Sequence, residues 1–231
     1  MTLIAGIDGC GPNWLCITLN TQDRSLSARV VSTPEFLPLT WAFAAIDIPI
    51  GVPDAGPREA DRQARAFLRA PRASSVFPCP LRATLQCESW EDMGAITRRL
   101  TGRGVAKQTF AILRKVREVN ELVRADPLAA RCFIEVHPEV SFAAWRGAAM
   151  KFNKKRPEGR AERLELIDAH FGKDATTVVR ESLKGTKVPS DDIADAFAAL
   201  WSAERYLLGR ALSLPSEPVY DSESIPMVIW Y

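Results

Sequence analysis

Residues 41–49, WAFAAIDIP, form a nearly continuous apolar run that contains one charged side chain, Asp47. A run of this kind is typical of a strand buried on both faces, which requires a sheet covered by helices on both sides. A carboxylate in such a strand is costly unless it is paired or bound to a metal ion. The run therefore predicts an α/β fold and singles out Asp47 as a candidate functional residue.

The remaining patterns place strands mainly early in the chain and helices mainly late. Strands are predicted over 3–8, 13–20, 27–33, 41–49 and 132–136, with 225–230 as a last strand or a docked end. Helices are predicted over 57–69, 89–100, 107–124, 138–146, 158–171, 174–183 and 190–209, with irregular segments at 71–84 and 151–157. Short turns between the first three strands favour an antiparallel meander. Residues 1–231 are thus expected to form one mixed α/β domain, with about 85–125 as a possible helical insertion.

Composition excludes several classes of protein. The chain has 231 residues and a formal charge of +2, so bulk charge does not predict nucleic-acid binding. No apolar run approaches the ~20 residues that span a bilayer, and the first residues do not resemble a signal peptide, which predicts a cytoplasmic protein. The five cysteines have no C-x-x-C spacing and accompany two histidines, so a zinc site has little support. Buried thiols are expected, with a catalytic Cys10 as the alternative.

Acidic side chains recur where predicted strands end. Asp8 ends the strand at 3–8, Asp47 lies near the end of the apolar run, and Glu135 ends the strand at 132–136, with Glu139 one turn later. Sites in α/β sheets lie beyond the carboxyl ends of the strands. If the first and fourth strands are parallel neighbours, Asp8 and Asp47 converge. The simpler alternatives are a turn residue for Asp8 before a glycine and an Arg partner for Glu135.

The helix predicted over 190–209 begins with a further acidic group. At 100° per residue, Asp192 and Asp195 share one stripe with three alanines, Ala196, Ala199 and Ala203. An alanine stripe lets a helix lie close to a sheet, which would bring both aspartates to the strand-end carboxylates. Alternatively, Asp192 only complements the helix dipole in the first turn, after Ser190 as the N-cap.

Converging buried carboxylates repel one another and need a counter-charge. Hard divalent ions with oxygen ligands, Mg²⁺ or Mn²⁺, are the natural choice. Three or four carboxylates can hold two such ions ~4 Å apart, an arrangement that supports in-line hydrolysis of phosphodiesters. The acidic pattern therefore predicts a metal site with one or two ions.

Six segments together resemble the DUF429 family, described as predicted nucleases, over nearly the whole chain. They are GIDGCGPNW (6–14), IDIPIGVP (46–53), the set Arg58, Asp61, Ala64 and Arg65, SSVFPCPLR (74–82), IEVHPEVSF (134–142) and DDIADAFAALWSA (191–203). The order of motifs also resembles the ribonuclease-H-like superfamily. Within it, the D-x-x-D-A pattern at 192–196 is similar to that of the RuvC-type Holliday junction resolvases.

The resemblance implies a ribonuclease-H-like five-stranded mixed sheet flanked by helices and a metal-dependent nuclease acting on DNA or RNA. It implies that Asp8, Asp47, Asp192 and Asp195 bind Mg²⁺ or Mn²⁺ and are catalytic. Glu135, the fifth catalytic candidate, and His137 belong to the family's own EVHPE motif and would be extra ligands or a general base. His137 is equally suited to helix capping or packing.

Local charge suggests where a nucleic acid would bind. Residues 98–117 carry a charge of +7 and residues 146–163 a charge of +5, which suits a phosphate backbone or simply a solvated surface. Side chains beside the carboxylates that would bind substrate are Arg58, Arg65, Arg72, Ser74, Ser75 and His137. Several of these, with Asp61, could instead form a structural ion-pair network. Trp14 and Trp145 are candidates for base stacking or for core packing.

Two other functions compete with a nuclease. A non-catalytic module that binds nucleic acid or nucleotide would keep the fold, although the full set of carboxylates argues against it. A nucleotide-phosphate binder of the actin and sugar-kinase type shares a glycine-rich first turn but needs two such domains, for which this chain is too short. The sequence does not determine the oligomeric state, and a homodimer is compatible with it.

Overall fold

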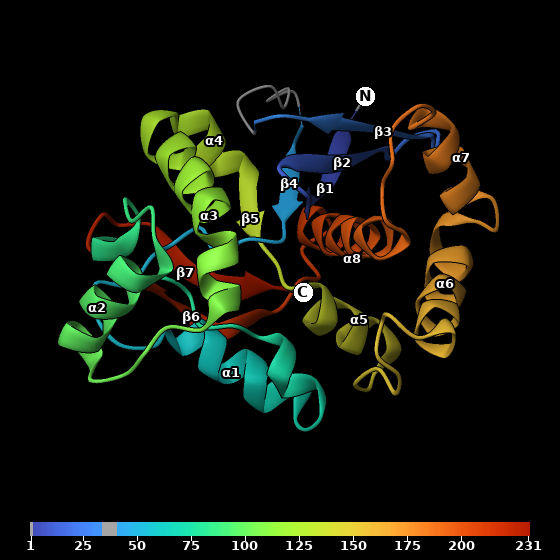
Figure 1. The fold of residues 1–231 in the computed structure, drawn as a ribbon. Coiled ribbons are helices and arrows are strands. Elements are labelled where there is room, and N and C mark those ends of the chain that lie inside the picture. The colour runs from blue at the N-terminus through green and yellow to red at the C-terminus, as the bar shows by residue number, and fades with distance from the viewer. Residues whose placement is uncertain (1, 34–40) are drawn as a thin grey trace.

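A five-stranded mixed sheet forms the centre of the computed structural model, which describes residues 2–33 and 41–231. The strands are β1 (Leu3–Cys10), β2 (Asn13–Asn20), β3 (Leu26–Val31), β4 (Phe43–Ile46) and β5 (Phe133–Glu135). Their order is β3-β2-β1-β4-β5, with β1 to β3 antiparallel and β1, β4 and β5 parallel. This is the mixed sheet predicted from the ribonuclease-H-like resemblance (Figure 1).

Eight α-helices surround this sheet in the described ranges. They are α1 (Glu59–Leu68), α2 (Trp90–Thr101), α3 (Lys107–Ala125), α4 (Pro127–Cys132), α5 (Pro138–Arg146), α6 (Pro157–Phe171), α7 (Ala175–Ser182) and α8 (Ser190–Leu207). Two short 3₁₀ helices, Arg72–Ser75 and Arg82–Thr84, lie in the segment predicted to be irregular. Each predicted helix matches an observed one to within a few residues.

The two faces of the sheet pack against different helices. Ile7 and Ile46 belong to a core with Val116 and Val119 of α3, whereas Ala45 and Leu15 belong to a second core that includes α8. Alternate residues along a strand point to opposite faces, so β4 is buried on both, as its apolar run predicts. The predicted helical middle of the chain, 85–125, is packed into the core through α3.

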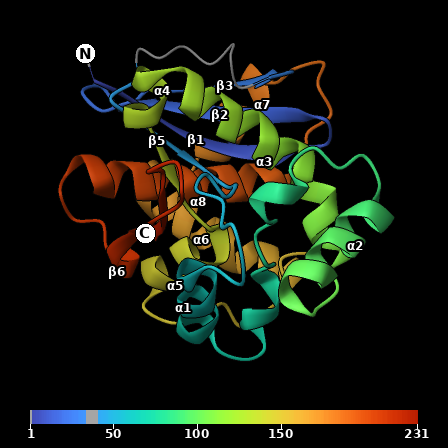
Figure 2. The same ribbon diagram turned by 90° about the vertical axis from the view of Figure 1, so that its left-hand side faces the viewer.

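Helix α8 lies exceptionally close to the sheet, and Figures 1 and 2 show it running beneath the strands. A Cβ atom added to Gly6 of β1 would lie only 2.1 Å from the backbone oxygen of Ala196, so no other residue type fits there without a shift. The predicted alanine stripe thus meets a glycine on the strand. This contact sets the distance between α8 and the sheet, and therefore the position of Asp192 and Asp195 relative to the ends of the strands.

Two elements were not predicted. Helix α4 begins at Pro127 with Asp126 as its N-cap, whose side chain accepts a hydrogen bond from the Leu128 amide at 2.8 Å. Strand β6 (Ser213–Tyr220) pairs with β7 (Pro226–Trp230) as an antiparallel hairpin, which makes the predicted tail segment a strand. The hairpin touches the main sheet through a bridge between Val136 and Trp230. Over the described residues, no helix has the length and apolar character needed to cross a membrane.

Candidate metal centre

Asp8 and Asp47 come together because β1 and β4 are parallel neighbours. Ile7 and Ile46 are register partners, and the Asp47 amide donates a hydrogen bond to the Ile7 oxygen at 2.9 Å. The next residue on each strand is therefore an aspartate that points to the opposite face, the side on which Gly6 meets α8. Asp8 is buried and Asp47 is half-buried.

Helix α8 adds Asp192 and Asp195 to this pair. Asp195 is only 3% exposed, and its charge raises the pKa of both strand-end aspartates. Asp192 is half-buried at the start of the helix, close to the Cys10 thiol. The four predicted metal ligands therefore lie together, which supports the expectation drawn from the alanine stripe.

The pKa values of these carboxyl groups reflect burial and mutual repulsion. Burial, followed by the charges of Asp47, Asp195 and Asp192, raises the pKa of Asp8 well above its usual range. Burial and the Asp195 charge raise the pKa of Asp47 to about 8. Burial raises the pKa of Asp195 to about 6, although Lys154 acts in the opposite direction. Carboxylates that are destabilised in this way have a strong tendency to attract a cation.

The cation already present is the side chain of Lys154, which forms an ion pair with Asp195. Burial disfavours the charged form of Lys154, but Asp195, Asp8 and Asp47 outweigh this effect and raise its pKa. Lys154 comes from the polar loop between α5 and α6. The ammonium group therefore neutralises part of the charge of four carboxylates.

Glu139, in the first turn of α5, is a fifth carboxylate beside this group. It is buried, its Oε1 atom pairs with Arg163 of α6, and its charge raises the pKa of Asp195. Within the described part of the chain, Glu139 Oε2 and Asp195 Oδ1 are buried without a hydrogen-bond partner. A buried carboxylate oxygen without a partner is costly, and a bound cation would satisfy it.

These oxygens fit a hard divalent cation by chemistry and burial. As the side chains stand, however, no group of three His, Cys, Asp or Glu residues among those described forms a ready metal site. The Lys154 ion pair gives a physical reason, because an ammonium among the carboxylates takes the role that a metal ion would have. An added cation would have to share Asp195 with Lys154 or replace it.

Glu135 lines the same cavity as Asp47 and adds to the charges that raise the pKa of Asp47, but its oxygens have partners of their own. It is the register partner of Ile46, so its side chain points to the α3 face, opposite Asp47. Arg58 donates to both of its carboxylate oxygens, at 2.8 and 2.7 Å, and the Ile50 amide donates at 2.8 Å. The structure therefore favours the alternative in which Glu135 has an Arg partner.

The guanidinium group of Arg58 is fully occupied by hydrogen bonds within the protein. Arg58 is 3% exposed, and its donors reach Asp61, Glu135 and the Gly51 oxygen. All five N–H groups of its guanidinium are satisfied, which leaves none for a substrate phosphate. Asp61 also accepts a hydrogen bond from the Cys79 amide at 2.9 Å. We call this cluster, Arg58, Asp61 and Glu135, the ion-pair network.

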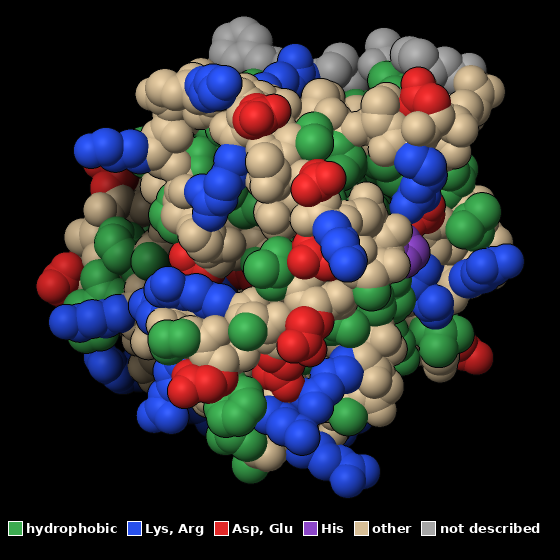
Figure 3. All heavy atoms as spheres, turned by 90° about the vertical axis from the view of Figure 1, so that its right-hand side faces the viewer, with side chains coloured by type: hydrophobic (Ala, Val, Ile, Leu, Met, Phe, Trp, Pro, Cys, Tyr) green, Lys and Arg blue, Asp and Glu red, His purple; other side chains and the backbone are tan. Residues whose placement is uncertain are grey.

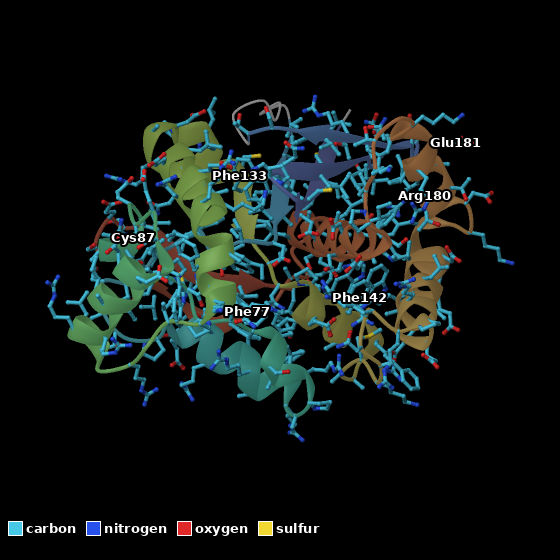
Figure 4. All side chains as sticks on the ribbon, in the orientation of Figure 1. Phe77, Cys87, Phe133, Phe142, Arg180 and Glu181 are labelled. Atoms are coloured by element: carbon cyan, nitrogen blue, oxygen red, sulfur yellow. The ribbon has the colours of Figure 1, made fainter. Side chains whose placement is uncertain are left out.

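A cavity of about 510 Å³ separates the aspartates from the remaining predicted substrate-binding residues. Its lining includes two aspartates, the ion-pair network and a basic and polar wall: Asp47, Asp195, Arg58, Asp61, Glu135, Glu139, Arg72, Ser74, Ser75, His137, Asn153, Lys154 and Lys155. Phe77, labelled in Figure 4, lies near the lower end of α3 and also lines it. Arg65 is not part of the lining, because its guanidinium is hydrogen-bonded to the Val76 oxygen at 2.6 Å.

His137, at the N-cap position of α5, makes no side-chain capping bond. Its Nε2 atom lies 3.3 Å from the Ser75 oxygen, and its Nδ1 atom is buried without a partner in the described residues. Burial lowers the pKa of His137, so the ring is neutral at pH 7. Ser74 and Ser75 donate to backbone oxygens of Pro71 and Arg72, both at 2.8 Å.

A family model described as a protein of unknown function, DUF429, matches residues 6–219. The chain belongs to the DUF429 family. No curated protein and no solved structure matches it. The family assignment predicted from the six sequence segments is thus confirmed, and the activity has to be argued from the site itself.

In this DUF429 chain, sequence reasoning missed Lys154, Arg163 and the role of Glu139. Lys154 lies in a polar loop that has no periodicity to place it, and only the +5 charge of residues 146–163 pointed to the region. Of the other candidates, Cys10 has a pKa raised to about 11 by burial and by Asp192, which disfavours its thiolate form at neutral pH. Trp14 is fully buried and Trp145 is stacked on Phe142, so both serve packing.

Proposed function

We propose that this DUF429 protein is a divalent-metal-dependent nuclease that hydrolyses phosphodiester bonds of DNA or RNA. The observation that carries the proposal is the convergence of Asp8, Asp47, Asp192 and Asp195 from two parallel strands and one helix. Their raised pKa values, together with the unpartnered oxygens of Asp195 and Glu139, indicate a site that is incomplete without additional positive charge.

In this proposal the four aspartates hold Mg²⁺ or Mn²⁺, with Glu139 as a neighbour that supports Asp195. Such an ion, when bound, would neutralise phosphate charge and make a water molecule more acidic. Neutral His137 lines the same cavity and would contact the substrate there. Arg72 and Lys155, which line the opposite wall, would bind the phosphate and hold it in place.

The second candidate is a module that binds nucleic acid without cleaving it. It is favoured by the ion pair between Lys154 and Asp195, which already neutralises one of the carboxylates without a metal. In that case the carboxylates would have no catalytic role, and the basic residues that line the cavity would bind the nucleic acid. The two candidates differ in whether a metal ion changes the substrate or only the stability of the protein.

The test incubates the protein with end-labelled single-stranded, duplex and branched DNA and RNA, with Mn²⁺, with Mg²⁺ or with EDTA. We expect cleavage only with metal, and a loss on the order of a hundredfold or more in Asp8→Asn and Asp195→Asn. Asp174→Asn, at an exposed aspartate at the N-terminal end of α7, is the matched control and should cleave normally.

Cleavage that persists in EDTA, or that survives Asp8→Asn, would rule out the nuclease proposal. Absence of cleavage on every substrate, combined with binding that does not depend on metal, would favour the binding module instead. Circular dichroism of each variant separates a chemical loss from a folding defect.

A further inference from the structure

A second groove, of about 500 Å³, adjoins the cavity beside the carboxylates. It is lined by Arg72, Lys151, Phe152, Asn153, Lys155 and Arg156. Four of these lining residues are cations and none is a carboxylate. A surface with this composition attracts a polyanion, because each Lys or Arg that pairs with a phosphate also releases a condensed counterion.

Most of the groove comes from one segment, residues 151–156, which we call the cationic strap. The strap is held in place by its neighbours. Glu162 of α6 accepts hydrogen bonds from the amides of Lys151 and Phe152, at 2.9 and 3.3 Å. A Cβ atom on Gly159 would lie 2.1 Å from the Asn153 oxygen, so the strap is packed directly on the start of α6. Its charges are therefore presented on a fixed backbone.

The groove and the cavity are neighbours that share part of their lining. Arg72, Asn153 and Lys155 line both, and Lys154, between the last two, reaches Asp195. A phosphate chain bound along the strap would therefore lie beside Lys154, whose ammonium group pairs with Asp195. Figure 3 shows basic side chains along the lower part of the face that carries α6 and α7, the side of the molecule to which the strap leads.

Two aromatic side chains accompany these cations. Phe152, in the groove, is 41% exposed, and Phe77, in the cavity, is 40% exposed. Exposed rings beside cations are what single-stranded nucleic acid requires, because an unpaired base has a free face to stack on. In a duplex the faces of the bases are covered by their neighbours, so these rings would gain no contact.

We infer that the groove along the cationic strap binds single-stranded nucleic acid in preference to duplex and leads it to the carboxylates. The inference rests on the proposed function for what happens at the aspartates, but binding itself does not require cleavage. Lys151, Lys155, Arg156 and Arg72 contact the phosphates, and Phe152 stacks on a base. Direct base recognition is not part of the inference, so binding should tolerate many sequences.

The test is fluorescence anisotropy in EDTA, with a labelled 20-nucleotide single strand and the duplex of the same length. We expect the single strand to bind about tenfold more tightly than the duplex, through stacking of one to two bases. A variant with Lys151→Glu, Lys155→Glu and Arg156→Glu should lose more than about tenfold and show a shallower dependence on salt. A second variant with Gln at the same three positions should show a smaller loss in the same direction.

Matched controls separate the groove from general charge and general aromatic exposure. Changing Lys173, Lys184 and Lys187 to Glu reverses the same number of exposed cations around α7 and should leave binding within about twofold. Phe152→Ala should cost about fivefold or more for the single strand and little for the duplex. Tyr220→Ala, at a residue 60% exposed on β6, should have no effect on either.

Equal or tighter binding of the duplex would overturn the inference, as would an equal loss in the control triple variant or no binding at all. Cleavage with Mn²⁺ is measured separately. Single-strand binding without cleavage would leave the inference standing and defeat the nuclease proposal. Cleavage by a protein that prefers duplex in EDTA would support the nuclease proposal and overturn the inference about the groove.

Discussion

The ends of two neighbouring strands carry acidic side chains that point to opposite faces of the sheet and have different partners. Asp47 follows β4 and points to the α8 face, where it meets Asp8 and Asp195. Glu135 ends β5 and points to the α3 face, where Arg58 and the Ile50 amide satisfy both of its oxygens. One residue of difference in register therefore places the two carboxylates on opposite faces of the sheet, Glu135 beside Arg58 and Asp47 beside other carboxylates.

This difference gives a physical criterion for assigning roles. In the ion-pair network, opposite charges and hydrogen bonds are matched, which is what a structural element requires. Around the aspartates, four carboxylates and Glu139 interact with the cations Lys154, Arg163 and Lys115, and two oxygens have no hydrogen-bond partner in the described residues. The first cluster holds the loop after β4 to α1, and the second is available to bind a ligand.

The largest expected effect comes from breaking the ion-pair network. Arg58→Met leaves Glu135 and Asp61 as buried carboxylates without their cation, so the free energy of unfolding should fall by about 3–5 kcal/mol. Urea denaturation measures this free energy of unfolding. Arg62→Met, which removes an exposed arginine one turn further along the chain, should leave the free energy of unfolding nearly unchanged. Equal effects of the two substitutions would contradict the assignment of Arg58 as a structural residue.

The corresponding change in the aspartate cluster should have the opposite sign. Asp47→Asn removes one of several repelling carboxylates, so at pH 8 in EDTA it should stabilise the protein by on the order of 1–2 kcal/mol. The same substitution should reduce any stabilisation by added Mn²⁺. Thermal unfolding with and without Mn²⁺ measures both effects, and a loss of stability on substitution in EDTA would contradict the account.

Removing Lys154 should change the affinity of the aspartate cluster for a metal ion, because its ammonium group competes with the ion for Asp195. Lys154→Met should bind Mn²⁺ about fivefold more tightly than the unmodified protein, by removal of a competing positive charge. Titration calorimetry measures the affinity. Lys173→Met, at an exposed lysine just before α7, should bind Mn²⁺ normally. Weaker binding after loss of Lys154 would instead make its side chain a support of the metal site.

The raised pKa values of the aspartates also predict how stability depends on pH. Asp47 and Asp195 have pKa values of about 8 and about 6, above those of an unfolded chain, so between pH 4 and 8 the folded state binds more protons. Stability in EDTA should therefore decrease as the pH rises through this window, by at most about 1.4 kcal/mol per pH unit for each proton of difference. The difference between the unmodified protein and Asp47→Asn isolates this contribution, and saturating Mn²⁺ should reduce the slope.

Much of the fold follows from local patterns in the sequence. The apolar runs and helical periodicities place the five strands and seven of the helices, and the alanine stripe of α8 predicts its close contact with the sheet. Helix α4 was missed because its six residues are too short for a periodic pattern, although Asp126 and Pro127 form an N-cap and first-turn signal. Strand β6 was missed because two prolines interrupt its alternation.

The candidate site was only partly predictable. The four aspartates could be grouped because strand ends and one helix face follow from periodicity. Glu135 was placed with them because its face depends on the register of β5 against β4, which the sequence does not contain. Lys154 and Arg163 reach the carboxylates through tertiary packing of the loop and helix α6, and nothing local specifies that contact.

The proposed divalent metal site consists of the four aspartates and does not include the ion-pair network. Mn²⁺ binding tests this by electron paramagnetic resonance, with the unmodified protein, Asp8→Asn and the control Asp174→Asn. We expect saturable binding of one or two ions that is lost in Asp8→Asn and preserved in Asp174→Asn. Absence of saturable binding, or binding that Asp8→Asn leaves unchanged, would contradict this proposal.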